Sequence, residues 1–228
     1  MKVFRKILLT LLILIIVVLS IFCIIGFSTY SAKLKEKPLV NRIEEITSDE
    51  HFVKFSDMSS DYRNAVIAVE DHRYYDHGPV DFIGIGRAIF NNIRYGELRE
   101  GGSTITQQVA KNIFFTQEQT FTRKLGEIFA AFDLEKNYTK NEIFELYVNT
   151  AYFGDGHYGI YDASYGYYNK SPKDLNLDES SMLAGVPNAP SVYAPTVNPT
   201  LAKQRQQHVI KKMLEYGYIT NEQALEIL

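Results

Sequence analysis

Tryptophan is absent from this chain of 228 residues, and cysteine occurs only once, at Cys23. A single cysteine excludes an intrachain disulfide, so the folded state must be held together by its hydrophobic core. With 46% hydrophobic and 22% charged residues, the chain has the composition of a folded protein. Its length is enough for one domain with a good core and an appendage.

Excess positive charge is also lacking over most of the chain. The 21 basic and 27 acidic residues beyond position 30 give that part a net charge of −6. A mildly acidic domain is a poor partner for nucleic acid, so we expect no nucleic-acid binding. Any anionic ligand would have to be held by a local group of cations.

Charge is missing altogether from residues 7–27, which are mostly Leu, Ile, Val and Phe. A helix of this length measures about 31 Å, enough to cross the hydrocarbon core of a bilayer. The basic residues of the tail 1–6 predict a cytoplasmic N-terminus, with everything beyond about residue 30 outside. The run is longer than the roughly 7–15 apolar residues of a signal peptide, and no A-x-A site follows it. We therefore expect an uncleaved, single-pass transmembrane helix.

The remainder of the chain is expected to divide into a polar, membrane-proximal linker, 28–58, and a mostly helical domain, 59–228, with small β elements at most. The Gly/Tyr-rich segment 152–170 is expected to be loop and short turns. Apolar residues at helical spacing and capping patterns predict helices over 82–93, 103–112, 120–136, 139–148, 177–185 and 198–217, and a last one from 220 onward.

Residues 69–78, VEDHRYYDHG, crowd several ionisable side chains together. On a helix, His72 and His77 would lie about 140° apart around the axis, so they would not converge on a metal ion. The stretch alone reads as a polar helix end with ion pairs. Glu70 is the exception, because it follows the apolar run 65–69 and can lie where the core meets a cleft, as a base would.

The stretch EGGSTITQQVAKN, 100–112, combines two glycines with the predicted start of a helix at Ser103. Free N–H groups at such a start favour an anion. Gln107, Gln108 and Lys111 are spaced to line one side of the helix. The alternative is an ordinary capped helix with a polar face, and the absence of GK[ST] excludes a Walker loop.

The stretch TRKLGEIF, 122–129, places Arg123 and Lys124 one turn before Glu127. A surface pair at this spacing would contribute only about 0.3–0.5 kcal/mol. Gly126 costs about 1 kcal/mol inside a helix, so it indicates that another segment packs closely there.

Taken together, the three stretches suggest one cleft with a base, a cationic cradle and a second carboxylate. A glycosidase would need one carboxyl group kept protonated as a general acid. A transferase that expels a pyrophosphate needs cations to neutralise the leaving group instead. Lys111, Arg123 and Lys124 fit the second requirement better.

The three stretches described above, together with two later ones, occur in an order that resembles the peptidoglycan glycosyltransferases. These membrane enzymes polymerise lipid II, either alone or joined to a transpeptidase in class A penicillin-binding proteins. The resemblance covers about residues 60–215 and, because the chain stops at Leu228, it is closest to the monofunctional form. The motifs are VEDHRYYDH, GGSTITQQVAKN, RKLGE, KNEIFELYVN, and YFGDGHYGI through GVPNAPSVYAP.

The resemblance implies a mainly α, lysozyme-like glycosyltransferase domain with a small membrane-proximal lobe, preceded by the transmembrane helix and lying outside a bacterial cell membrane. It implies transfer of the growing lipid-pyrophosphate-linked chain to the GlcNAc 4-hydroxyl of lipid II, with inversion and release of undecaprenyl diphosphate. The expected partners are lipid II, the growing glycan strand, the membrane and other wall-synthesis proteins.

The resemblance also implies roles for individual residues. Glu70 matches the catalytic base, with Asp71 beside it. Lys111 and Arg123 match residues that hold the donor's pyrophosphate, and Glu127 matches a second acidic residue that orients this pyrophosphate or its Mg²⁺. The residues that match the lining of the cleft are Ser103, Thr104, Gln107 and Gln108.

Two motifs depart from the pattern of the family. In H-x-G-x-D, the glycine has moved by one position, because His77 is followed directly by Gly78 and only then by Asp81. In Y-F-G-K, the third residue is Asn169. The first change concerns the shape of a loop and leaves the match of Glu70 intact.

Two other functions are compatible with parts of the pattern. A lytic muramidase or transglycosylase acting on the same polymer would need a protonated carboxyl group and would not need Lys111 or Arg123. A non-catalytic, membrane-anchored scaffold for wall-synthesis proteins would not need Glu70.

Some predicted helical segments are more apolar than one buried face requires. We expect part of this lobe to dip into the membrane interface, the alternative being ordinary core. The residues concerned are Phe82, Ile83, Ile85, Phe90, Phe114 and Phe115.

Overall fold

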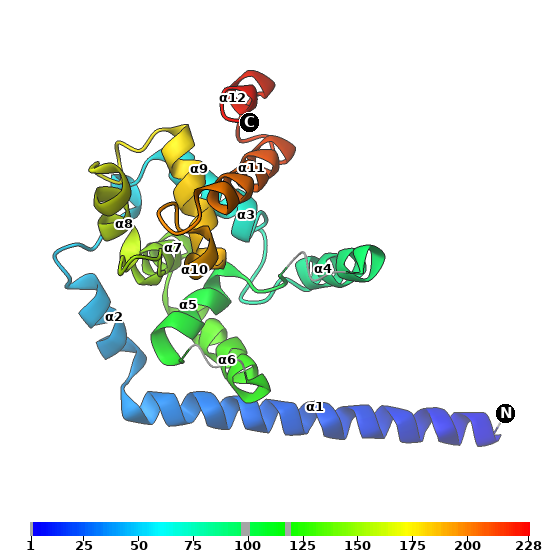
Figure 1. Cartoon of the computed structure of the whole chain (residues 1–228). Helices are drawn as coiled ribbons and strands as arrows, with labels where there is room; N and C mark the ends of the chain where they lie inside the picture. Colours follow the sequence, from blue (N-terminus) through cyan, green and yellow to red (C-terminus); the bar gives the residue numbers. More distant parts are fainter. Residues whose placement is uncertain (1, 97–100, 117–119) are drawn as a thin grey trace.

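The computed structural model describes residues 2–96, 101–116 and 120–228 and is built from helices (Figure 1). Within these residues, the only β interaction is an antiparallel bridge between Tyr152 and Tyr158. The predicted mainly α class is confirmed. The elements in chain order are α1 (Lys2–Glu36), α2 (Leu39–Thr47), η1 (Phe55–Asp57), α3 (Ser60–Glu70), α4 (Phe82–Tyr95), α5 (Ile105–Phe114), α6 (Phe121–Asn137), α7 (Lys140–Thr150), α8 (Gly159–Tyr168), α9 (Leu177–Gly185), η2 (Val186–Asn188), α10 (Pro190–Tyr193), α11 (Pro199–Glu215) and α12 (Asn221–Leu225).

The core is built by short helices that cross one another in the body of the molecule (Figure 1). Helix α9 packs against both α3 and α11, while α5 packs against both α6 and α7. Each helix contributes large side chains that are fully buried, and burial of one such side chain contributes about 1.5–3 kcal/mol. This packing fixes the C-terminal end of α3 relative to α5 and α11. Examples of these buried side chains are Tyr62, Ile105, Phe144, Leu183 and Ile210.

Helix starts follow local capping chemistry. The predicted capping box of α7 is present, with Thr139 and Glu142 bonding each other's backbone, and α12 begins with the same arrangement. The cap of α5 is Thr104 rather than the predicted Ser103, because Gln107 completes a capping box with Thr104. Ser103 is left to face the neighbouring helix α6.

The segment expected to be a polar linker, 28–58, is largely helical. Helix α1 continues to Glu36, and α2 follows after Pro38, which cannot continue a helix. Leu39 and Ile43, four residues apart, form the buried side of α2. The expected linker therefore contains ordered helix, because two apolar contacts at helical spacing are enough to dock an otherwise polar helix. The division of the chain into these segments stays a prediction.

The segment 152–170 was expected to be loop, but its second half forms α8. Ile160 and Ala163 are fully buried and hold this helix against the core. Asn169 ends it at φ 51°, a left-handed conformation that glycine or asparagine adopts most readily. Asparagine can therefore stand where the family pattern has glycine.

Helix α1 has two different surroundings along its length. Its segment Phe4–Glu36 is long and apolar enough to cross a membrane, by length and composition. Its later part packs against α6, where a Cβ on Gly126 would lie 2.8 Å from Cζ of Phe115 and 3.0 Å from Cγ2 of Thr29. The close packing expected at Gly126 is confirmed.

Helix α4 projects from the helical body (Figure 1). Phe82 is 78% exposed and Phe90 is 63% exposed, whereas Phe114, on α5, is buried in the core. The expectation of an unusually apolar surface therefore holds for α4 and is wrong for Phe114. Insertion of α4 into the membrane interface stays a prediction.

Candidate active site

A cavity of about 320 Å³ lies where the end of α3 meets α5, α6 and α11. The nine predicted site residues that line it are Glu70, Asp71, Ser103, Gln107, Gln108, Lys111, Arg123, Lys124 and Glu127. Thr104 is the predicted residue that does not line it, because its side chain is buried and caps α5. Glu100, the first residue of the second sequence stretch, lies outside the described residues. Three segments far apart in sequence thus converge on one cavity.

Glu70 is the last residue of α3 and points into the cavity. Its side chain is only 9% exposed. Oε2 accepts a hydrogen bond from Nε2 of Gln108 at 2.7 Å. Oε1 accepts no hydrogen bond, and Nη2 of Arg205 lies 3.7 Å from it. One carboxylate oxygen is therefore fixed by Gln108, while the other is buried near the guanidinium of Arg205 without a hydrogen-bond donor among the described residues.

Glu127 is buried on α6 and holds two cations in place. Its Oε1 lies 2.8 Å from Nη1 of Arg123, and its Oε2 lies 2.8 Å from Nζ of Lys124. Nζ of Lys124 also donates to Oγ of Ser103 at 2.7 Å. The side chain of Glu127 is only 2% exposed, so it binds two cations from a buried position. The surface ion pair considered from the sequence would instead be exposed.

Lys111 extends from α5 toward the same cations. Burial lowers the pKa of its ammonium group; Arg123 and Lys124 lower it further, while Glu127 opposes the change. Three cations held close together repel one another, and an anion bound between them relieves this repulsion. We call Lys111, Arg123 and Lys124 the cationic cradle.

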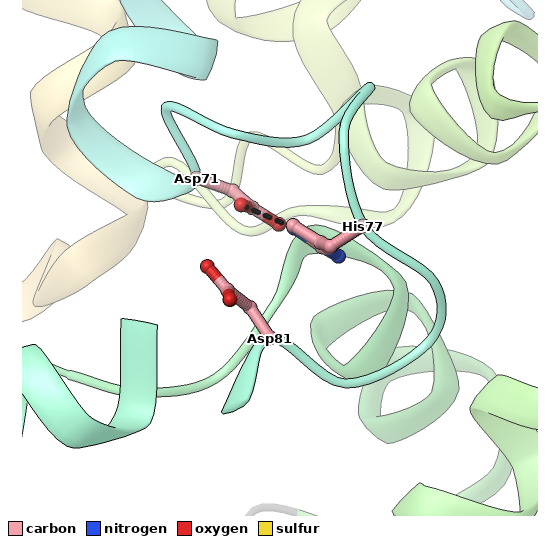
Figure 2. A group of neighbouring side chains, drawn as sticks. All are labelled: Asp71, His77 and Asp81. Carbon is pink, nitrogen blue, oxygen red and sulfur yellow. Dashed lines mark hydrogen bonds and ion pairs between the residues drawn. The ribbon is translucent and has the colours of Figure 1, made fainter. Parts of the chain in front are cut away.

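Asp71 and His77 form a pair in the loop after α3 (Figure 2). Nε2 of His77 lies 2.7 Å from Oδ1 of Asp71, and Oδ2 accepts the backbone N–H of Ile105 at 3.1 Å. The helical positions considered for His72 and His77 are not adopted, because α3 ends at Glu70. Asp71 therefore ties the end of α3 to the start of α5, although it also lines the cavity.

Asp81 lies beside this pair, and ligand atoms of the three residues lie within 4.8 Å of one another (Figure 2). Arg73 donates to both oxygens of Asp81, from Nη2 at 2.6 Å and from Nε at 3.2 Å. Burial raises the pKa of Asp81, but the bonds from Arg73 outweigh it and lower the pKa to about 2. Asp81 also caps α4. These partners account for the cluster without a metal ion.

Sequence reasoning missed the contribution of α11. Arg205, His208 and Lys212 line the cavity opposite α6. Their spacing of three and then four residues places them on one face of the helix, and this was the signal available in the sequence. Arg205 also donates from Nε to the carbonyl of Gly185 at 3.3 Å, which fixes its position next to Glu70.

The loop after α3 and helix α4 each add one residue to the lining of the cavity, His72 and Arg87. The ring of His72 is stacked on Tyr216, with centroids 4.2 Å apart, and its Nε2 lies 2.8 Å from Nη1 of Arg87. Burial lowers the pKa of His72, and Arg87 lowers it further, which favours the neutral form of the ring. The pair borders the cavity near Glu70.

The carboxylates of the described lining already have cationic or hydrogen-bonding neighbours. Both oxygens of Glu127 face cationic side chains, and both oxygens of Asp71 are engaged by His77 and the backbone. Glu70 has one oxygen on Gln108 and the other near Arg205. Mg²⁺ in proteins is usually held by one or two carboxylates together with substrate phosphates, so the expected role of Glu127 toward this ion stays a prediction.

Comparison with known proteins identifies the family of this chain. A family model described as transglycosylase matches residues 36–214. Penicillin-binding protein 1A of Neisseria lactamica is 48% identical over 78% of this chain, and penicillin-binding protein 1F of Bacillus subtilis is 44% identical over 78%. The chain spans 22% and 25% of the length of these two relatives.

A crystal structure of penicillin-binding protein 1A from Haemophilus influenzae is also similar. It is 26% identical, with a TM-score of 0.37, over 54% of this chain and 15% of that one.

Proposed function

The chain belongs to the transglycosylase family, and from this premise we propose that it polymerises the glycan strands of peptidoglycan. The growing strand, linked to a lipid pyrophosphate, would be transferred to the 4-hydroxyl of the GlcNAc of lipid II. Inversion at the anomeric carbon yields a β-1,4 linkage and releases undecaprenyl diphosphate.

Glu70 is the base of this reaction. Its Oε1, which lies 3.7 Å from Nη2 of Arg205, accepts the proton of the acceptor's 4-hydroxyl, and the hydroxyl oxygen forms the new bond to the anomeric carbon of the donor's MurNAc. Gln108 holds the other carboxylate oxygen in place during the transfer. A single base is sufficient, because a diphosphate leaves without a proton from a general acid.

The cationic cradle receives the leaving group. As the bond between the anomeric carbon and the diphosphate oxygen breaks, negative charge develops on the diphosphate. Lys111, Arg123 and Lys124 stabilise this charge, as preorganised donors do in other transferases. Glu127 keeps the cradle oriented and offsets part of the repulsion between its cations.

The observation that carries the proposal is that Glu70 and the cradle line the same cavity. Six cationic side chains face three carboxylates among the described lining residues, although the chain beyond position 30 is acidic overall. A lytic enzyme has no use for such an excess of cations. The cationic residues are Arg87, Lys111, Arg123, Lys124, Arg205 and Lys212.

Mg²⁺ belongs to the proposal only as an ion that arrives with the substrate's diphosphate. Both oxygens of Glu127 already face cationic side chains, so no step is assigned to the ion. Activity in the presence of a chelator, measured with and without added Mg²⁺, tests whether the ion is needed at all.

The membrane arrangement is part of the same proposal. We infer a cytoplasmic tail at 1–6, a transmembrane helix within α1 and a catalytic domain outside the cytoplasm. A substrate that stays anchored in the bilayer requires a cleft near its surface.

The decisive test incubates the full chain, reconstituted in vesicles, with lipid II. Long glycan strands are the expected product, and Glu70→Gln should lower the rate by about 10²–10⁴-fold with its helical content unchanged. Glu50→Gln, at an exposed turn, is the control and should retain the wild-type rate. Fragmentation of preformed glycan, or normal turnover by Glu70→Gln, would overturn the proposal.

A further inference from the structure

A second cavity of about 320 Å³ lies between α2, the turn that follows α2, and the start of α8. Among the described residues, it has no lining residue in common with the first cavity. Figure 1 shows α2 and α8 on the side of the body away from α4. The proposed transfer reaction uses none of the residues around this second cavity.

Aromatic rings form a row along the start of α8. Tyr158 and Tyr161 line the second cavity. The ring centroid of Tyr152 lies 4.6 Å from that of Tyr158, and the centroid of Tyr165 lies 4.7 Å from that of Tyr161. Tyr158 is 65% exposed, although its ring would stabilise the fold if it were buried. A row of rings that stays exposed beside a cavity is typical of a ligand-binding surface.

The backbone fixes the position of Tyr158. Tyr152 and Tyr158 form the antiparallel bridge, and the turn between them contains two glycines at positive φ. Gly159, the next residue, has φ 80°, and a Cβ there would lie 3.1 Å from the carbonyl oxygen of Asn149. Glycine adopts this conformation readily and leaves room for the close approach. Local backbone structure therefore holds Tyr158 at the cavity without burying its ring.

The rest of the lining supplies hydrogen-bond acceptors. Oδ1 of Asp49 accepts the backbone N–H of His51 at 2.8 Å, and Oδ1 of Asp162 lies 3.1 Å from Nδ1 of the same residue. Oδ2 of each aspartate accepts no hydrogen bond from the described residues. Glu45, the third carboxylate, pairs with Lys37. A ligand that fits this lining is therefore rich in hydrogen-bond donors.

The lining selects among classes of ligand. It contains no lysine or arginine among the described residues, so its carboxylates repel phosphates, nucleic acids and anionic lipids. Sugar hydroxyls donate hydrogen bonds to carboxylates, and the apolar face of a pyranose ring can lie on an aromatic ring. A cavity of this volume is large for a single ammonium group, the other ligand rich in donors. An extended sugar chain also matches the extended row of rings.

We propose that this cavity and the adjoining row of rings bind a neutral stretch of glycan, at a site separate from the catalytic cavity. Tyr158 stacks on a sugar ring, while Asp49 and Asp162 accept hydrogen bonds from its hydroxyl groups. The bound strand is one that the protein has made or one that is already present in the wall. The first source rests on the proposed function, whereas the binding of a neutral glycan does not.

The test is the binding of chitotetraose, a soluble and neutral β-1,4-linked GlcNAc tetramer, to the full chain in detergent micelles, measured by calorimetry. Tyr158→Ala should weaken binding at least about tenfold because the stacking surface is lost. Tyr158→Phe keeps the ring and should bind within about twofold of the wild type. Tyr75→Ala is the matched control, because it removes a 51% exposed ring outside both cavities and should bind like the wild type.

Equal affinities of Tyr158→Ala and Tyr75→Ala for chitotetraose would overturn the proposal, and so would a wild type that does not bind it. Tighter binding of tetralysine than of chitotetraose would also overturn it, because the ligand would then be a cationic peptide. If Tyr158→Ala fails to fold, Asp162→Ala decides, with an expected loss of about tenfold in affinity.

Polymerisation of lipid II by the same samples identifies the source of the strand. Tyr158→Ala should act at the wild-type initial rate, because Tyr158 lies outside the catalytic cavity. Shorter strands would show that the site holds the product, and weaker co-sedimentation with purified wall glycan would show that it holds strands already made. If neither changed, the proposal would be overturned for glycan strands. A wild type without polymerisation would contradict the proposed function and leave the chitotetraose result standing.

Discussion

Gln108 on α5 donates a hydrogen bond of 2.7 Å from its Nε2 to Oε2 of Glu70 on α3. Lys111 lies three residues further along α5 and lines the same cavity. One helix therefore holds the base in orientation and also carries part of the cationic cradle. The separation between the two is set by helix geometry rather than by a loop.

Gln108→Leu should lower kcat by roughly ten- to a hundredfold, because a hydrogen bond to a charged group contributes about 1.5–3 kcal/mol. KM should change little, since Glu70 and the cradle both remain. Steady-state kinetics with lipid II provide the measurement. Gln204→Leu, which changes an exposed glutamine on α11, is the control. A wild-type kcat for Gln108→Leu would show that Glu70 needs no such support.

Donor binding should weaken at alkaline pH through Lys111. Burial, followed by Arg123 and Lys124, lowers its pKa below the ordinary 10.5, so the ammonium loses its proton at a lower pH than a free lysine would. The affinity for a lipid diphosphate should therefore fall with rising pH below that value. Lys111→Arg should remove this dependence because arginine stays charged. An identical alkaline profile for both proteins would contradict the role of Lys111.

Replacement of cradle residues should act mainly on binding of the donor. Arg123→Ala leaves Oε1 of the buried Glu127 without its cation, and loss of one partner of such a pair also destabilises the fold. Lys111→Ala is the cleaner change, because Arg123 and Lys124 both remain beside Glu127. We expect a rise in donor KM of about tenfold or more. An unchanged KM would remove Lys111 from the cradle.

The pair of Asp71 and His77 should stabilise the fold in a pH-dependent manner. Burial lowers the pKa of His77, but its hydrogen bonds to Asp71 and to the Gly78 carbonyl outweigh this effect and raise the pKa above 6.5. The resulting stability is fully present below pH 6.5 and is lost as the pH rises through the raised value. Urea unfolding of the wild type and of His77→Gln should therefore differ most at acidic pH.

Asp71→Asn should cost about 1–3 kcal/mol of unfolding free energy, because the amide cannot replace both bonds of the carboxylate. His51→Gln is the matched control: His51 pairs with Asp162 at 3.1 Å, but both side chains are exposed and such pairs contribute little. If Asp71→Asn lost donor binding without any loss of stability, Asp71 would contact the substrate rather than support the loop.

Local chemistry made the helix starts predictable, and tertiary packing explains where prediction failed. The capping box of Thr139 and Glu142 needs only four consecutive residues, so it can be recognised in the sequence. The docking of α2 depends on what Leu39 and Ile43 meet in space, which no local pattern reveals. Thr104 rather than Ser103 caps α5 because Gln107 completes a capping box with it, and Lys124, distant in sequence, donates a hydrogen bond to Ser103.

Only the part of the candidate site that α3, α5 and α6 contribute could be predicted from the sequence. Glu70, Lys111 and Arg123 belong to motifs with unusual local composition, and the order of these motifs identified them. Arg205 and Lys212 stand on a polar helix that reads as an ordinary solvated face. Only the packing of α11 against α3 and α9 brings them to the cavity.

Gly126 couples the membrane-spanning helix to the cradle and offers the last test. In Gly126→Ala, the added Cβ would lie 2.8 Å from Cζ of Phe115 and 3.0 Å from Cγ2 of Thr29, so the Phe115 ring must shift and α6 must adjust its position against Thr29 of α1. We expect a loss of about 1–3 kcal/mol in stability and a raised donor KM, because Arg123 and Glu127 move with the helix.

Gly86→Ala is the matched control for this change. Gly86 lies inside α4 and nothing lies within 4 Å of its added Cβ, so alanine should stabilise the helix by about 0.5–1 kcal/mol. Opposite signs for the two substitutions, measured by thermal unfolding in the same vesicles, are the expected outcome. If Gly126→Ala instead behaved like Gly86→Ala, the close crossing of α1 and α6 would not constrain the cradle.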